Sequence, residues 1–263
     1  MTLFARIVVG VDGTDWGFEA LRQALVLAKE EPLLHAVTAL DTAPAIHAGF
    51  RAPVFMELLE REAEDARDTA EAIIGGRDGC SASVVRGKPV DVLRRERDEL
   101  QATLVALGGR RSSRFLGIML GDTGTELVHD AACSSLLACP ADDRPWRPRK
   151  IVVGFDGSSY SSAALRSAEE LAQALGVTVE VLTATGGKAI ERDAAWADRV
   201  QTWDPADPVG ALVERSRTVD LVVVGSRGVH GVQTIGSVSE RIAHQAHCTA
   251  LIVHEPEASS ADA

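Results

Sequence analysis

A short aliphatic sequence that occurs twice decides the fold of this chain. Residues 7–14 read IVVGVDGT, and residues 151–158 read IVVGFDGS. In both places a run rich in Ile and Val ends at an aspartate and a glycine, which is typical of a buried strand followed by a tight turn. A repeat at this distance predicts that the chain contains two copies of one structural unit.

Other matches follow in the same order in both copies. Residues 104–108, LVALG, match residues 221–225, LVVVG, and residues 129–133, HDAAC, match residues 244–248, HQAHC. The distance between matched residues falls from 144 at the first pair to 115 at the last, so the second copy is 29 residues shorter. Most of that loss lies in the middle of the second copy.

A segment rich in proline and charge separates the two copies. Residues 139–149 contain three prolines among charged residues, a composition with little helix or strand propensity. We therefore expect a first domain at residues 1–141, a linker at 142–149, a second domain at 150–256 and a flexible tail at 257–263.

The apolar periodicity alternates between strand and helix along each copy. For the first copy it predicts strands at residues 7–11, 34–40, 81–85, 103–107 and 134–138, and helices at residues 15–27, 54–74, 89–99 and 123–132. The second copy repeats this order from Ile151 to His254, with a much shorter second helix near residues 188–198. Continuous aliphatic strands that alternate with helices predict an α/β fold with a parallel, doubly wound sheet.

The composition argues against several classes of protein. The chain is 46% hydrophobic with a net charge of −11, which is ordinary for a globular protein and disfavours nucleic acid or an anionic membrane as partner. No signal-peptide pattern opens the sequence, and every apolar run is shorter than the roughly 20 residues of a membrane span. The four cysteines fit neither a zinc site nor a disulfide framework, although Cys133 and Cys139 are near enough in sequence to pair. We expect a cytoplasmic protein with reduced, mostly buried thiols.

The position of a ligand site follows from the expected fold. In an open α/β sheet, ligands bind beyond the carboxyl ends of the strands, where the strand order reverses. The turn after the first strand contains Asp12 or Asp156, and the loop after the fourth strand begins at Gly108 or Gly225. The two aspartates could hold a metal ion on a nucleotide or only shape the turn, and we favour shaping. In the second copy, four glycines precede a helix whose free amides would form a phosphate site.

Motifs for catalysis and metal binding are missing from the sequence. The pairs Gly87-Lys88 and Gly187-Lys188 lack the other residues of a P-loop. The sequence has no nucleophile elbow, no Ser–His–Asp motif, and no histidine or cysteine spacing that suits a metal. We therefore predict no catalytic residue and no metal ligand and do not expect an enzyme, with slow hydrolysis of a bound nucleotide left open.

The glycine loop of the second copy resembles the signature of the universal stress protein family, and the resemblance extends over both copies. In that family the pattern G-x2-G-x9-G-[ST] after the fourth strand marks the members that bind ATP. The second copy has Gly225, Gly228, Gly236 and Ser237, but seven residues separate Gly228 from Gly236 where the family has nine. The resemblance implies two tandem flavodoxin-like, Rossmann-like domains, each a five-stranded parallel sheet with helices on both faces.

The resemblance also implies a binding site for ATP, with or without magnesium, in the second copy. Adenine would contact the chain near Asp156 and the end of the second strand, and ribose would lie near Gly154 and Gly225. The residues implied to bind the nucleotide are Gly154, Asp156, Gly157, Ser158, Gly225, Arg227, Gly228, Gly236, Ser237 and Val238.

The first copy departs from the family pattern at the phosphate helix. Gly108 and Gly121 keep the family spacing, but Arg111 replaces the second glycine and Asp122 replaces the Ser or Thr. A carboxylate there repels phosphate and competes for the same amides, and it is also a good helix cap, although nearby arginines at positions 110, 111 and 114 could offset the charge. We expect a weakened or lost site, for which the candidate residues are Gly10, Asp12, Gly108, Gly121 and Thr123.

Members of the family commonly dimerise through their last strands. The tandem therefore resembles a fused pair, in which residues 134–138 meet residues 249–253 in an intramolecular pseudo-dimer, and a further homodimer stays open. The leading function is ATP binding, mainly in the second domain, within a stress-response or signalling module. One alternative is a scaffold that binds protein partners and no nucleotide, and another is a sensor of AMP or a cyclic nucleotide, which a shortened loop would suit.

Overall fold

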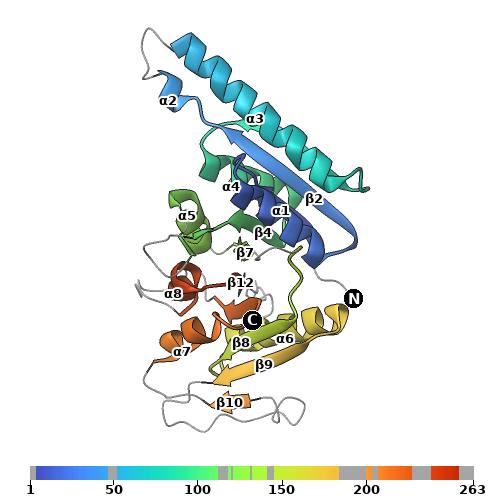
Figure 1. The fold of residues 1–263 in the computed structure, drawn as a ribbon, viewed down its shortest axis with the longest axis vertical. Helices are drawn as coiled ribbons and strands as arrows, with labels where there is room; N and C mark the ends of the chain where they lie inside the picture. Colours follow the sequence, from blue (N-terminus) through green and yellow to red (C-terminus); the bar gives the residue numbers. More distant parts are fainter. Residues whose placement is uncertain are drawn as a thin grey trace, which may run out of the picture.

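One continuous sheet of ten strands runs through both halves of the chain in the computed structural model (Figure 1). The structure describes residues 4–46, 52–111, 118–119, 121–130, 132–140, 145–183, 200–202, 207–226 and 238–254. The strand order is β10-β9-β8-β11-β12-β7-β4-β1-β2-β3. The first half contributes β1 (Phe4–Gly10), β2 (Ala28–Leu40), β3 (Cys80–Arg86), β4 (Leu104–Gly108) and β7 (Ser134–Ala138). The second half contributes β8 (Lys150–Phe155), β9 (Thr178–Thr183), β10 (Val200–Thr202), β11 (Leu221–Gly225) and β12 (Thr249–Val253).

Helices cover both faces of this sheet. The first half has α1 (Asp15–Leu27), α2 (Ala43–Ile46), α3 (Ala52–Ile74), α4 (Pro89–Leu100) and α5 (Asp122–Asp130), and the second has α6 (Ser159–Leu175), α7 (Pro208–Arg215) and α8 (Val238–Gln245). Local signals start several of them. The Thr14 side chain caps α1 by accepting from the Gly17 amide, the Ser158 side chain caps α6, and Asp207 caps α7 just before a proline.

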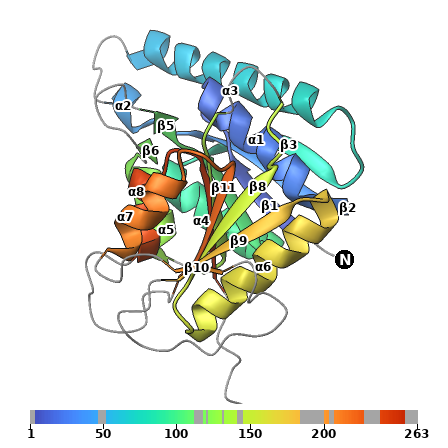
Figure 2. The same ribbon diagram turned by 60° about the horizontal axis from the view of Figure 1, so that its bottom comes forward.

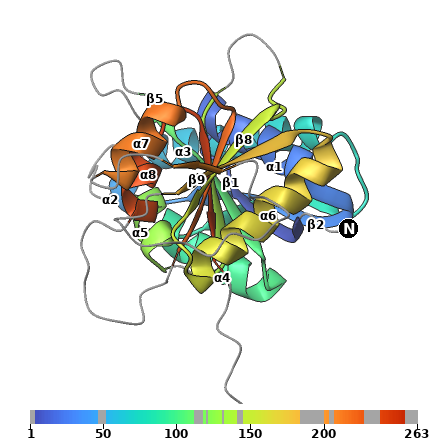
Figure 3. The same ribbon diagram turned by 90° about the horizontal axis from the view of Figure 1, so that it is seen from below.

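Each face of the sheet carries one apolar core that is continuous across both halves. On the face covered by α1 and α6, Ile7 and Val9 of β1 join Ile151 and Val153 of β8 in one buried cluster. The side chains that alternate with these along the strands, such as Val8 and Val152, point to the opposite face and pack under α4, α7 and α8. Figure 2 and Figure 3 show α6 on one side of the sheet and α7 and α8 on the other. The expected flavodoxin-like architecture, with helices on both faces of each half, is confirmed.

The two halves meet where their last strands pair, as the sequence predicts. Among the described strands of the large sheet, β7 and β12 form the one antiparallel pair, in a register that places Leu136 opposite Leu251. All other neighbours in the sheet are parallel. Antiparallel pairing of equivalent strands is what an approximate two-fold axis between the halves produces.

Hydrogen bonds at this junction repeat from one side to the other. The Cys139 amide donates to Thr249 Oγ1 at 3.1 Å, and in the equivalent place the His254 amide donates to Ser134 Oγ at 3.2 Å. Gln23 of α1, with 0% exposure, adds a contact that the sequence did not reveal. Its side-chain amide donates to the Cys139 carbonyl at 2.7 Å, and its Oε1 accepts from Thr249 Oγ1 at 2.7 Å. Buried polar groups therefore connect the halves as well as the strand pairing.

Several details differ from the sequence prediction. Helix α1 and strand β7 have the predicted bounds, but β2 begins at Ala28 rather than at residue 34. Neither α2 nor the hairpin of β5 (Arg110–Arg111) and β6 (Ile118–Met119) was predicted, because no apolar periodicity marks these short elements. The helix expected near residues 188–198 lies outside the described residues.

The linker differs from the expectation of a simple extended connection. Residues 145–148 form neither helix nor strand, as predicted, but Trp146 is buried and belongs to the core cluster on the α1 and α6 face. The amides of Arg149 and Lys150 both donate to Asp220 Oδ2, at 2.9 and 3.0 Å. The end of the linker is therefore anchored to both the core and the second half.

The cysteines and the helices bear on three further points of the sequence analysis. All four cysteines are free, so Cys133 and Cys139 do not form a disulfide. The expectation of mostly buried thiols is wrong, because only Cys139 is fully buried and the other three are half-buried. In the described part of the chain, no helix has the length and apolar character needed to cross a membrane.

Candidate functional site

The candidate ligand site lies at the carboxyl ends of β8 and β11, where the strand order of the second half reverses. Strand β8 lies between β9 and β11 and places Val153 opposite Val223 on one side and opposite Val181 on the other. The chain continues from β8 into α6 on one face, while α8, the helix after β11, packs on the opposite face. This divergence is the switch point at which doubly wound sheets bind ligands.

The turn after β8 is held in shape by its own side chains. Asp156 Oδ1 accepts from the Ser158 amide at 3.0 Å, and Gly157 has φ of +82°, which a residue with a side chain rarely adopts. Ser158 Oγ in turn accepts from the Ser161 amide at 3.2 Å and so caps α6. Asp156 and Gly157 are exposed at the edge of the sheet. One oxygen of the Asp156 carboxylate therefore shapes the turn, as the sequence analysis favoured.

The first half forms the same turn. Asp12 Oδ1 accepts from the Thr14 amide at 3.1 Å and from Thr14 Oγ1 at 2.6 Å. Gly13 has φ of +77°, which matches the left-handed glycine of the second half. The two halves therefore share the same hydrogen bond from a backbone amide to the aspartate of the turn. In both halves this turn presents backbone groups at the strand ends.

Glycines at the ends of β4 and β11 have a packing role that the sequence could not specify. A Cβ on Gly225 would overlap the carbonyl group of Tyr160 in the first turn of α6, and a Cβ on Gly108 would overlap that of Trp16 in the first turn of α1. The absent side chains let the start of each helix approach the end of the strand. Protein packing alone therefore accounts for glycine at these two positions.

Gly10 and Gly154, near the ends of β1 and β8, face the other side of the sheet. A Cβ on Gly154 would lie 2.9 Å from Leu212 Cδ1 of α7, and a Cβ on Gly10 would lie 2.7 Å from Leu107 Cδ2. The close neighbour is in both cases the end of a flexible side chain, so these glycines fit an apolar contact. The expected ribose contacts of Gly154 and Gly225 stay predictions.

The phosphate loop itself is described only at its two ends. Ser226 is buried, and its amide donates to the Val253 carbonyl at 2.9 Å, which continues the β11–β12 ladder by one residue. Val238 begins α8 and is 38% exposed. The other predicted phosphate contacts, Arg227, Gly228, Gly236 and Ser237, lie outside the described residues. The amides in the first turn of any helix lack partners within that helix, which is why helix starts commonly bind phosphate.

The corresponding helix of the first half begins with a carboxylate. The Gly121 carbonyl accepts from the Thr125 amide at 3.0 Å, so Gly121 precedes the helix and Asp122 is its first residue. The helix cap is therefore Gly121 and not Asp122, which corrects one part of the sequence interpretation. Asp122 is exposed and Thr123 half-buried, and open space surrounds a Cβ built on Gly121. An acidic side chain in the first turn stabilises α5 and disfavours a bound phosphate.

The hairpin β5–β6 is a further difference between the two halves of the chain. It occupies the place of the first half's phosphate loop, and β6 packs against α8 of the second half, as Figure 2 shows. A loop that would otherwise face a ligand thus contributes to the contact between the halves.

Ionisable clusters of the described residues lie away from the strand ends. Burial would raise the pKa of Asp130 at the end of α5, but hydrogen bonds from Arg97 at 2.8 Å and Arg94 at 3.0 Å outweigh burial and hold that pKa below its usual value. Burial raises the pKa of the Cys133 thiol to about 11. Among the described residues, no group of three His, Cys, Asp or Glu side chains is arranged to hold a metal ion. The ion pairs of Asp130 stabilise the packing of α5 on α4, and neither Asp130 nor Cys133 indicates a catalytic or metal-binding role.

Comparisons with known proteins support this architecture. The model of the universal stress protein family matches residues 3–138, 148–195 and 188–254. A universal stress protein of Mycolicibacterium smegmatis is 28% identical over 94% of this chain and 96% of its own length, and one of Mycobacterium tuberculosis is 27% identical over 95% of each. The crystal structure of a universal stress protein from Archaeoglobus fulgidus has a TM-score of 0.70 at 17% identity, covering 95% of this chain and 98% of that one. A putative universal stress protein from Pseudomonas aeruginosa has a TM-score of 0.64 at 14% identity, covering 95% and 93%.

Proposed function

Because the chain belongs to the universal stress protein family, we propose that its second half binds ATP, alone or with magnesium, as part of a stress-response or signalling module. No reaction is proposed for the bound nucleotide. The protein acts in this view through occupancy of the site, in the cytoplasm, and without nucleic acid or membrane.

The observation that carries the proposal is the switch point between β8 and β11. The chain leaves β8 through the exposed turn at Asp156 and Gly157. After the neighbouring strand β11, the next helix is α8, which starts at the exposed Val238. A nucleotide fits such a place because its base and sugar need backbone polar groups while its phosphates need helix amides. The sequence adds the glycines and the serine of the family signature at positions 228, 236 and 237.

The charge at the helix start supports one site rather than two. In the first half, Asp122 places a carboxylate in the first turn of α5. In the second half the equivalent position is Ser237, and the acidic residue in the first turn of α8, Glu240, lies three positions further along the chain. Since a carboxylate and a phosphate compete for the same helix amides, the second half is the better site.

The proposal is tested by removing one amide from the start of α8. Val238→Pro deletes the N–H of the first residue of that helix, a position where proline is well tolerated. Val238→Ala is the matched control, because it shortens the same side chain and keeps the amide. One hydrogen bond to a charged phosphate is worth roughly 1.5–3 kcal/mol, so Val238→Pro should bind ATP about 10- to 100-fold more weakly than Val238→Ala in calorimetry.

A second substitution tests the charge argument. Gly236→Asp introduces beside the start of α8 the kind of carboxylate that Asp122 supplies in the first half, and it should abolish ATP binding. Equal affinities of wild type, Val238→Pro and Gly236→Asp for ATP would contradict the proposed site. A panel of AMP, cyclic AMP, ADP and ATP tests in the same assay whether the loop, two residues shorter than the family pattern, prefers fewer phosphates.

The packing of the strand-end glycines favours one competing function. Because Gly108 and Gly225 are explained by the close approach of α1 and α6, their presence does not require a ligand. A scaffold that binds protein partners and no nucleotide would keep the same glycines. Absence of binding for every nucleotide, with folded and nucleotide-free wild type, would favour this scaffold.

A further inference from the structure

The first half carries a helix segment that the described part of the chain leaves largely uncovered. In α3, buried residues occur only in the second part of the helix, at Ala63, Ala66, Ala70 and Ile74. None of residues 52–62 is buried, and neither core cluster includes a side chain from them. Figure 1 shows this end of α3 at the outer edge of the first half, with α2 beside it.

This uncovered segment is apolar although it is exposed. Val54 is 74% exposed and Leu58 is 46% exposed, and they are one helical turn apart on the same face. Phe55, Met56 and Leu59 are half-buried beside them. In the described residues the large exposed apolar side chains are four in number, and two of them form this pair. Exposed apolar side chains that adjoin on one helix face mark a candidate interaction surface, whereas single scattered ones are ordinary.

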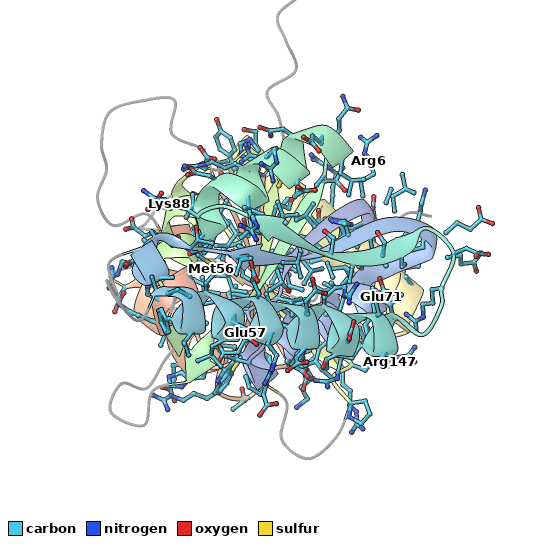
Figure 4. The ribbon with its side chains drawn as sticks, turned by 90° about the horizontal axis from the view of Figure 1, so that it is seen from above. Arg6, Met56, Glu57, Glu71, Lys88 and Arg147 are labelled. Atoms are coloured by element: carbon cyan, nitrogen blue, oxygen red, sulfur yellow. The ribbon has the colours of Figure 1, made fainter. Side chains whose placement is uncertain are left out.

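Acidic side chains continue the same face toward the middle of α3. Glu62 and Asp65 follow Leu58 at helical spacing, both are exposed, and neither has an ion-pair partner in the described part of the chain. Over its whole length α3 has seven acidic and two basic residues. Arg61 is the exposed base on this face, and its guanidinium lies 4.0 Å from Glu57. Figure 4 shows α3 in front of the sheet, with Met56 and Glu57 toward one end and Glu71 toward the other.

The second half is much shorter in the equivalent place. Only 16 residues separate β9 from β10, whereas 39 separate β2 from β3. The repeated architecture does not depend on the added residues, because the second half forms its strands without them. The projecting part of α3 is therefore a feature of the first half beyond what the shared fold requires.

We propose that this face of α3, defined by Val54, Leu58, Glu62 and Asp65, docks a basic amphipathic helix of a partner protein. Apolar anchors at helical spacing in the partner would cover Val54 and Leu58, and lysines or arginines on its flank would face Glu62 and Asp65. The acidic side chains Glu62 and Asp65 favour a basic partner helix over a second copy of the chain. A second copy has a net charge of −11 and would place its own acidic α3 against the first, which is repulsive.

The test uses a synthetic helical peptide of leucine and lysine, labelled with a dye and titrated with the full chain in fluorescence anisotropy at 150 mM salt. A scrambled peptide of the same composition and a leucine–glutamate peptide of the same spacing are the comparison probes. We expect the leucine–lysine helix to bind at least about tenfold more tightly than either, since only it matches both the spacing and the charge. Equal binding of the helical and scrambled lysine peptides would overturn the proposal.

Variants locate the binding to this face. The double substitution Val54→Gln and Leu58→Gln keeps good helix formers and should weaken binding at least about tenfold, whereas Leu33→Gln, at an exposed apolar residue of β2, should change it less than about twofold. Glu62→Lys with Asp65→Lys should also weaken binding at least about tenfold. Glu30→Lys with Glu31→Lys, an equal change of charge on exposed residues of β2, should weaken it less than about threefold.

Other occupants would give different results and would overturn the proposal. If a second copy covers this face, sedimentation will detect a dimer that Val54→Gln with Leu58→Gln dissociates. If another segment of the same chain covers the face, no peptide will bind and the same double variant will lower the melting temperature. Neither experiment depends on nucleotide binding, so the docking surface and the proposed site are tested separately.

Discussion

The substitution Thr249→Val should weaken the junction between the two halves. Thr249 is 1% exposed at the start of β12, and its hydroxyl donates to Gln23 Oε1 at 2.7 Å and accepts from the Cys139 amide at 3.1 Å. Valine has nearly the same shape as threonine and preserves the strand, so the change removes the two hydrogen bonds and little packing.

The size of the effect follows from the burial of these groups. Each hydrogen bond lost by a buried polar group costs roughly 1–3 kcal/mol, so Thr249→Val should cost about 2–6 kcal/mol of unfolding free energy. For a chain of this size, 1 kcal/mol shifts the melting temperature by roughly 2–4 °C. We therefore expect the melting temperature to fall by about 4–24 °C.

Calorimetric melting of nucleotide-free protein measures this prediction. Thr178→Val is the control, because Thr178 begins β9 with an exposed side chain and should change the free energy by less than about 0.5 kcal/mol. Ser134→Ala removes the acceptor of the His254 amide in the equivalent place and should cost about 1–3 kcal/mol. A melting temperature for Thr249→Val within about 1 °C of wild type would refute the role of this junction.

Three other predictions concern residues away from the junction. The pKa of Asp130 lies below its usual value because hydrogen bonds from two arginines of α4 outweigh burial. Its ion pairs thus contribute stability that is present above about pH 4 and lost as pH falls through the lower folded pKa, so wild type should lose more unfolding free energy than Asp130→Asn between pH 5 and 2.5 in urea titrations. Gly225→Ala should cost about 2 kcal/mol or more even without ligand, because its Cβ would overlap the Tyr160 carbonyl. Gly121→Ala has open space and loses only the preference of a helix cap for glycine over alanine, so it should cost about 1 kcal/mol or less; equal urea midpoints would contradict this reading. Since burial raises the pKa of Cys133 to about 11 from 9.0, iodoacetamide at pH 8 should alkylate it about 100-fold more slowly in folded than in unfolded protein, as followed by mass spectrometry, and equal rates would be inconsistent with the burial.

The parts of the fold that depend on local signals could be predicted from the sequence. Helix α1 has the predicted bounds because Thr14 caps it and apolar residues repeat at helical spacing. The pairing of β7 with β12 was predicted because the family that the chain resembles commonly dimerises through its last strands, and because these two short aliphatic strands needed a partner. The helix signal requires only neighbouring residues, whereas the strand pairing also required the family resemblance.

Features that depend on distant contacts could not be predicted. The first residues of β2, which include Glu30 and Glu31, join the sheet although they are polar, because Ala28 pairs with Phe4 beyond an irregularity in the register. Trp146 follows a proline-rich run that reads as solvent-exposed linker, yet the core of both halves accommodates its ring. The burial of Gln23 depends on Thr249, which is 226 residues away.

The strand-end glycines mark the limit of site prediction from sequence. A glycine after an aliphatic strand indicates that something approaches the backbone closely, and Gly225 was therefore assigned to a ligand. The structure places the first turn of α6 close to Gly225, and the ligand contact stays a prediction. A sequence cannot distinguish these neighbours, because either a ligand or a helix would require the same missing side chain.

The central claim is that one half of the chain binds nucleotide and the other does not, and the stoichiometry of ATP binding tests it most directly. Isothermal titration of magnesium and ATP into wild type, refolded after removal of bound nucleotide, counts the sites. The account predicts one ATP per chain, because the first half has the carboxylate of Asp122 at the start of the phosphate helix where the second half has the hydroxyl of Ser237. Two ATP per chain would contradict the argument from Asp122, and no ATP would contradict the proposed function itself.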